Sequence, residues 1–155
     1  MKLLPALQAG LAGAGALTVI HQYLQKTDED APRMDLLGMN ALAKLLNKPF
    51  EEIKHDEDAY NLTLLGDLVL NSLYYSLVSI GKRKSTFFRG TLLGLLAGAG
   101  AVILPKYLNL NPAYSNRTTI TKAETIGLYL IAGIIASAEY TSSTDKKSIR
   151  KSNRR

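Results

Sequence analysis

The stretch GTLLGLLAGAGAVILPKYL, residues 90–108, decides how this chain of 155 residues is built. Up to Pro105 it contains no charged side chain, and its only hydroxyl before that point is that of Thr91. As a helix it reaches about 30 Å, which is the thickness of the hydrocarbon core of a bilayer. A helix of a soluble bundle needs a polar stripe along its length, and this one has none. The stretch therefore predicts a transmembrane helix.

Three other windows of similar length carry few charged residues, and most charges fall between the windows. The fold class that follows is all-α, a bundle of four transmembrane helices in one domain of residues 1–141. A basic tail of residues 142–155 follows this domain. The four predicted spans cover residues 3–24, 61–81, 90–108 and 123–141.

The segment between the first two spans is much longer than the segment between the last two, and residues 33–60 of it are interpreted as an outer amphipathic insertion. It contains MDLLGMNALAKLL, residues 34–46, which predicts an amphipathic helix that ends before Pro49. A short amphipathic helix beside a membrane span lies in the interface or caps the bundle. Its expected apolar face consists of Leu37, Ala41 and Leu45, with Met34, Leu42 and Leu46 beside them.

Basic residues indicate the orientation of the chain. Four crossings place both termini on one side, together with the turn at residues 82–89. These segments are rich in Lys and Arg and hold a single acid, Asp145, whereas the first loop on the other side is acidic. The positive-inside rule therefore predicts cytoplasmic termini. The tail DKKSIRKSNRR, residues 145–155, is interpreted as resting on anionic lipid, and no nucleic-acid partner is expected.

The phrase LAGAGA occurs twice, at residues 11–16 and 96–101. This repeat raises the hypothesis of two tandem helical hairpins related by an axis along the membrane normal. Small residues also let helices approach closely in lipid. Gly13 of the first span, and Gly90, Gly94 and Gly98 of the third, are therefore candidate packing residues. We expect the first and third spans to meet, either within one chain or across a homo-oligomer.

Polar residues inside the predicted spans form the candidate site. Asp67, Asn71 and Tyr74 follow one face of the second span, and His21 lies at a similar depth in the first. A carboxylate inside a membrane is costly, so we expect Asp67 to face the bundle. Three interpretations stay open: structural hydrogen bonding, a pathway for a solute or proton, and catalysis.

Sequence motifs for familiar chemistries are missing. The chain has no cysteine, which excludes disulfides, thiolate metal sites and cysteine nucleophiles, and it has only two histidines. Glu51 and His55 share a helical face, but one histidine among acids is a weak metal signal. We therefore expect no metal, no cofactor and no catalytic residue.

Three strings, DAPRMDLLGMNALAKLL at residues 30–46, GDLVLNSLYYSLV at 66–78 and SNRTTITKAET at 115–125, carry a resemblance. They are similar to segments of small multi-pass bacterial inner-membrane proteins to which no activity is assigned. The resemblance implies a bacterial inner membrane and supplies no reaction.

Two functions are expected from these features. The first is a non-enzymatic accessory or scaffold subunit that contacts membrane lipids and packs on a membrane-protein partner, or on its own copies, through its glycine faces. The alternative is a small transporter or channel component with an outward-facing polar site at His21, Asp67 and Asn71. A membrane enzyme acting on a lipid or an envelope precursor is a weaker third hypothesis.

Overall fold

The structure is a computed structural model that describes the backbone of residues 3–152 and the side chains of residues 3–145. Within that part of the chain, every regular element is a helix. The elements are α1 (Leu3–Thr27), α2 (Met34–Leu45), α3 (Phe50–Ile53), α4 (Glu57–Ser76), η1 (Leu77–Ser79), η2 (Arg83–Ser85), α5 (Thr86–Tyr107), α6 (Ala113–Asn116) and α7 (Thr119–Ser152).

Four helical segments are long and apolar enough to cross a membrane. The predicted all-helical chain with four candidate membrane spans is therefore confirmed. The four segments are Leu3–Thr27, Glu57–Ser79, Arg83–Tyr107 and Thr119–Asp145.

Side-chain caps move two helix starts earlier than the hydropathy windows predict. Asp56 accepts hydrogen bonds from the backbone N–H groups of Asp58 (2.9 Å) and Ala59 (3.1 Å), so α4 begins at Glu57. Thr118 accepts from the N–H of Thr121 (3.0 Å), so α7 begins at Thr119. At its other end α7 continues to Ser152. The basic side chains of residues 146–155, and Lys2, lie outside the described residues.

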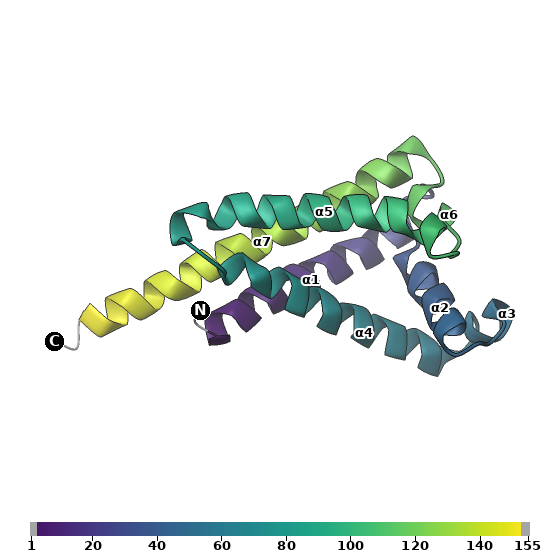
Figure 1. Ribbon diagram of the computed structural model, residues 1–155, viewed down its shortest axis with the longest axis horizontal. Helices are drawn as coiled ribbons and strands as arrows, with labels where there is room; N and C mark the ends of the chain where they lie inside the picture. The colour runs from purple at the N-terminus through teal and green to yellow at the C-terminus, as the bar shows by residue number, and fades with distance from the viewer. Residues whose placement is uncertain (1–2, 153–155) are drawn as a thin grey trace.

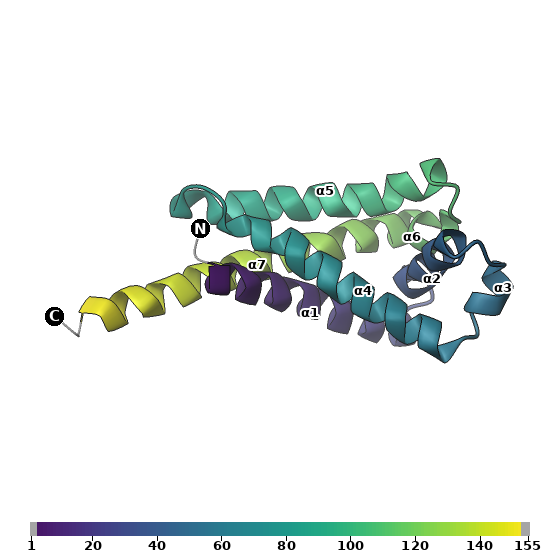
Figure 2. The same ribbon diagram turned by 60° about the horizontal axis from the view of Figure 1, so that its bottom comes forward.

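Helix α7 is the centre of the arrangement (Figures 1 and 2). It packs extensively against both α1 and α5, and α4 packs on α1. The spatial order is therefore α4, α1, α7, α5. Helices α4 and α5 share a short connection and diverge from it in both views. The two ends of the chain lie toward one end of the bundle, and α2, α3 and α6 lie at the opposite end, called the α2 end below.

The glycines of α5 explain why its partner is α7. A Cβ at Gly94 would lie 2.6 Å from the carbonyl oxygen of Tyr129, and one at Gly98 would lie 2.7 Å from the Cα of Ile126. Gly90 likewise abuts Gly133. These glycines are needed for the close approach of two backbones.

Within the described residues, the predicted close packing of the first span on the third is therefore not found, because α1 and α5 each pack on α7 instead. Gly13 of α1 lies against the carbonyl of Ala132 in α7, where a Cβ would approach to 2.7 Å. A contact between the first span of one chain and the third span of another stays a prediction.

Helix α2 buries a different face from the one predicted. Met39 and Ala43 are buried against Ile53 of α3 and Ala59 of α4, whereas Leu45 is 82% exposed. The apolar spacing of α2 is compatible with burial of either face. The short helix α3 that follows Pro49 determines which face is buried. Leu37 is buried as predicted.

Tyrosines tie α4 to its neighbours near the α4–α5 connection. The fully buried Tyr75 donates a hydrogen bond to the carbonyl of Tyr129 in α7 (2.7 Å). Tyr74 donates to the carbonyl of Leu93 in α5 (2.9 Å).

Candidate functional site

Ten polar side chains line a small cavity toward the α2 end, called the polar cavity below. Its volume is about 50 Å³, enough for a few water molecules or one small polar group. Helices α1, α2, α4 and α7 form its walls. Its polar lining consists of Thr18, His21, Gln22, Gln25, Asp35, Tyr60, Thr63, Asp67, Thr125 and Tyr129.

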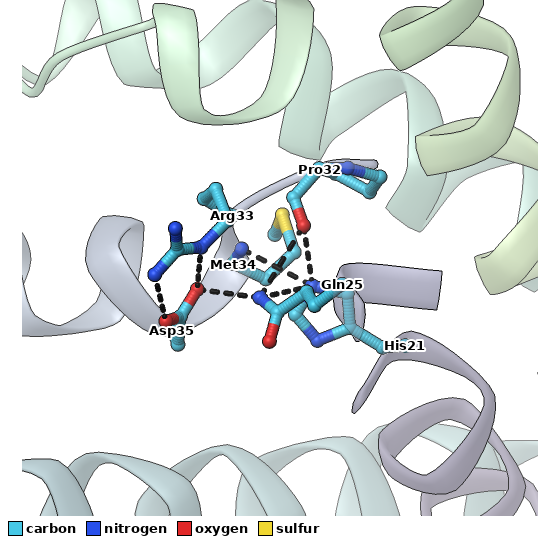
Figure 3. A network of polar contacts seen from close by, with 6 residues as sticks. All are labelled: His21, Gln25, Pro32, Arg33, Met34 and Asp35. Carbon is cyan, nitrogen blue, oxygen red and sulfur yellow. Dashed lines mark hydrogen bonds and ion pairs between the residues drawn. The ribbon is translucent and has the colours of Figure 1, made fainter. Parts of the chain in front are cut away.

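His21 holds the connection between α1 and α2 (Figure 3). Its ring is buried, and Nε2 lies 2.7 Å from the carbonyl oxygen of Pro32. Since that oxygen can only accept, Nε2 is the donor in this contact. Gln25, one turn further along α1, donates to Asp35 at 2.6 Å. His21 and Gln25 therefore fasten the start of α2 to the end of α1.

Asp35 is the charged centre of this network. Its carboxylate accepts two hydrogen bonds from Arg33, from Nε at 3.1 Å and from one Nη at 2.9 Å. Burial alone would raise the pKa of Asp35, but the hydrogen bonds and positive charge of Arg33 outweigh it and hold that pKa below its usual value. The same contact raises the pKa of Arg33. The pair is therefore ionised, and it adds no net charge to the cavity.

Asp67 is different because no cation lies beside it in the described residues. Its partner is Asn71, which donates to the carboxylate at 2.9 Å from one turn along α4. Asp67 lines the polar cavity and is exposed at the side of α4 rather than enclosed by the bundle. His21 lines the same cavity, yet the hydrogen bonds found in residues 3–145 do not join it to Asp67.

Thr63 supplies a second polar group that nothing in the described chain satisfies. Its hydroxyl oxygen is buried without a hydrogen-bond partner, and the residue lies one turn before Asp67 in the cavity wall. Its methyl group presses on Gly38 of α2, where only a glycine leaves room. A buried hydroxyl without a partner is costly, so this position favours a bound water or ligand.

Tyr74 of α4 lines a second cavity, called the apolar groove below, of about 410 Å³, which follows α5 and is also bordered by α2 and α7. The groove shares two wall residues, Met34 and Tyr129, with the polar cavity. Its other walls are Leu37, Leu96, Ala97, Gly100, Ala101, Leu104, Pro105, Leu108 and Leu110.

The structure thus distributes the candidate residues over three places. His21 and Asp67 share the polar cavity with Asn71 beside them, Tyr74 lies in the apolar groove, and the candidate packing glycines lie at the interfaces with α7. Sequence analysis missed Gln25, Asp35 and Thr63. Helical spacing offered a signal for two of them, because Gln25 is four residues from His21 and Thr63 is four residues from Asp67.

Within the described residues, no group of three His, Cys, Asp or Glu side chains is placed to hold a metal ion. His21, Gln25, Arg33 and Asp35 bond to one another or to the backbone, which leaves Asp67 and Thr63 to meet a ligand. A carboxylate and a hydroxyl together accept hydrogen bonds from a small cation or a neutral donor.

No family model, curated protein or solved structure matches this chain. Its function is therefore argued from its own geometry.

Proposed function

We propose that this protein is a non-enzymatic accessory or scaffold subunit in a bacterial inner membrane, with both termini in the cytoplasm. The positive-inside distribution of Lys and Arg supports this orientation. We also propose that α2 lies in the membrane interface, and that α1–α4 and α5–α7 are two tandem hairpins. The extensive packing within each of these pairs is consistent with the second point.

The observation that carries the proposal concerns two glycines that face away from the chain. A Cβ at Gly15 of α1 or Gly127 of α7 would meet nothing within 4 Å, whereas Gly10, Gly13 and Gly94 fit tightly against neighbouring helices. Glycine in a helix costs about 1 kcal/mol relative to alanine. In lipid, small residues let a second helix approach closely, so these positions suit a protein partner.

Purification of the full chain in mild detergent, with mass spectrometry of the proteins that remain bound, tests this function. Gly15→Leu and Gly127→Leu should each lower the yield of a stoichiometric partner or of the homo-oligomer by about tenfold, because the bulky side chain keeps backbones apart. Thermal unfolding of both variants should stay near that of the wild type, since both positions are open.

Gly15→Ala and Gly127→Ala are the matched controls. Both positions have room for a methyl group, and alanine keeps the helix surface small, so both variants should leave the partner in place. A wild-type protein that remains a lone monomer under these conditions, or a Gly15→Ala variant as defective as Gly15→Leu, would contradict the proposal.

One observation favours the alternative, a transporter or channel component. His21 and Asp67 line the same cavity, and Asp67 is exposed there. In that case Asp67→Asn should abolish flux of protons or small cations in proteoliposomes while the fold survives. Flux that is absent from the wild type, or unchanged in the variant, removes this alternative.

A further inference from the structure

The apolar groove has the dimensions of a lipid chain. Along α5 it extends from Leu96 to Leu108, about 18 Å at 1.5 Å per residue. One leaflet of a bilayer contributes about 15 Å of hydrocarbon, half of roughly 30 Å. Gly100 widens the groove in the middle, since a Cβ there would meet only the side chain of Leu104, at 3.4 Å.

Both ends of the groove are closed, which decides between a lipid chain and a protein helix. Tyr74 bridges to Leu93 at one end, and Met34 and Leu37 of α2 stand at the other. A transmembrane helix needs about 20 residues and must continue past both barriers. A single acyl chain can enter from the open side of the groove and end inside it.

The polar cavity beside the groove determines which lipid head group can bind. Of its two carboxylates, Asp35 is paired with Arg33, whereas Asp67 has only the neutral Asn71. Asp67 and Tyr74 are seven residues apart, so the carboxylate and the groove share one face of α4. An uncompensated carboxylate repels an anionic group and attracts a cation that can donate hydrogen bonds.

A primary ammonium satisfies this chemistry. It carries three N–H donors in a compact group that suits the volume of about 50 Å³. Asp67 and the unpartnered hydroxyl of Thr63 are one helical turn apart and can both accept from it. A trimethylated ammonium has no N–H to donate and is larger. Arg33, next to the groove residue Met34, has a half-exposed guanidinium with N–H groups left over for a phosphate.

We propose that the apolar groove and the polar cavity together bind one aminophospholipid of the phosphatidylethanolamine type. The acyl chain occupies the apolar groove, the ammonium binds Asp67 and Thr63, and the phosphate lies toward Arg33. This site is separate from the Gly15 and Gly127 face, so it goes beyond the proposed scaffold function.

Reconstitution of the full chain in nanodiscs with equal amounts of phosphatidylethanolamine and phosphatidylcholine tests the proposal. After gentle transfer to detergent, mass spectrometry measures the two lipids that stay bound. The wild type should retain the ethanolamine lipid with a preference of about tenfold, the size expected for one charge-assisted hydrogen bond. Asp67→Asn should reduce this preference to nearly one, and Thr63→Val should reduce it in part.

A further variant separates binding of the lipid head group from binding of the acyl chain. Gly100→Leu narrows the groove and should reduce retention of both lipids about equally. Gly66→Leu, which lies outside the site, should behave like the wild type. Each variant is first checked for a helical circular dichroism spectrum and a monodisperse elution profile.

Equal retention of the two lipids by the wild type would overturn the assignment of the head group. Retention that is unaffected by Gly100→Leu would overturn the assignment of the groove, as would a protein helix cross-linked inside it. The scaffold proposal is tested by a different outcome. Its expected result is that Gly15→Leu loses the protein partner while lipid retention stays unchanged. Absence of any partner in the wild type would contradict it.

Discussion

Glycine has two different roles in this chain, and the surroundings of each residue tell them apart. Gly94 and Gly98 lie against the backbone of α7 with no room for a Cβ, while Gly15 and Gly127 meet nothing within 4 Å. In lipid, where hydrophobic burial does not drive helices together, the first kind supplies the close van der Waals contact that holds the bundle. The second kind contributes nothing to this fold.

Gly94→Ala should therefore destabilise the bundle, and Gly127→Ala should not. The added methyl at Gly94 would lie 2.6 Å from the carbonyl of Tyr129, so the two helices must separate, at a cost of about 1–3 kcal/mol. At Gly127 the same change gains up to about 1 kcal/mol of helix propensity. Reversible unfolding in detergent measures both. Equal stability of the two variants would contradict the role assigned to Gly94.

The Arg33–Asp35 pair predicts that the docking of α2 depends on pH. The pKa of Asp35 is held below its usual value, so its contribution is complete above the unfolded-state pKa of about 3.9 and is lost as the pH falls through the lower folded-state pKa. A spin label on Leu45→Cys, an exposed position in a chain with no cysteine, should become mobile below about pH 4.

Asp35→Asn is the control for this measurement. The amide cannot titrate, so the label should be mobile at every pH and show no transition in the same range. A transition of the same midpoint in Asp35→Asn would assign the pH dependence to another group.

At the scale of helices, the repeated phrase LAGAGA has the same surroundings in both copies. Gly13 and Gly98, its third residues, both lie against the backbone of α7, Gly13 at Ala132 and Gly98 at Ile126. Their neighbours two positions on, Gly15 and Gly100, are both free of backbone contact. The repeat therefore marks two surfaces that bind a common partner rather than two surfaces that bind each other.

The start of α7 depends on a pair of threonines. Thr118 caps the first turn through the N–H of Thr121 (3.0 Å), and the Thr121 hydroxyl donates to the carbonyl of Asp30 (2.8 Å). Thr118→Ala should cost about 1 kcal/mol and increase amide exchange in the first turn of α7. Thr119→Ala, at an exposed neighbour, is the control and should leave exchange unchanged. Equal exchange in both variants would show that the cap is dispensable.

Hydropathy and length were enough to predict the four apolar helices, because the bilayer leaves the backbone few alternatives. They did not predict which helices touch. The glycines at positions 90, 94 and 98 indicated a packing face, but nothing in the sequence near them specified α7 as the partner. The buried face of α2 was mispredicted because its apolar residues surround more than half of the helix, and α3 decides among them. The pairing of Asp35 with Gln25 joins separate elements, so local spacing could not show it.

For the whole molecule, the arrangement is an open row of helices rather than a closed bundle. The central helices α1 and α7 have more buried residues in their apolar windows, 39% each, than α4 and α5, with 17% each. The apolar groove along α5 is bordered near the α4–α5 connection by Tyr74 and at the α2 end by Met34 and Leu37. The row therefore offers the surrounding membrane an internal groove as well as an outer surface.

The proposed orientation can be tested with single cysteines, since the natural chain has none. Lys48→Cys lies after α2, and Ser142→Cys lies in the part of α7 near the other end; both positions are exposed. A membrane-impermeant maleimide should label the first in intact cells and the second only after lysis. The reverse pattern would invert the topology, and labelling of both in intact cells would contradict the three crossings proposed between the two positions.

The central place of α7 has a consequence for biogenesis. Helices α1 and α4 can pair as soon as both have left the ribosome, but α5 must wait for the last span before its glycine face finds a surface. During that interval the glycine face of α5 has no helix packed against it. Insertion of this chain should therefore finish in one late step, and the fourth span decides whether the third is retained in the assembly or degraded.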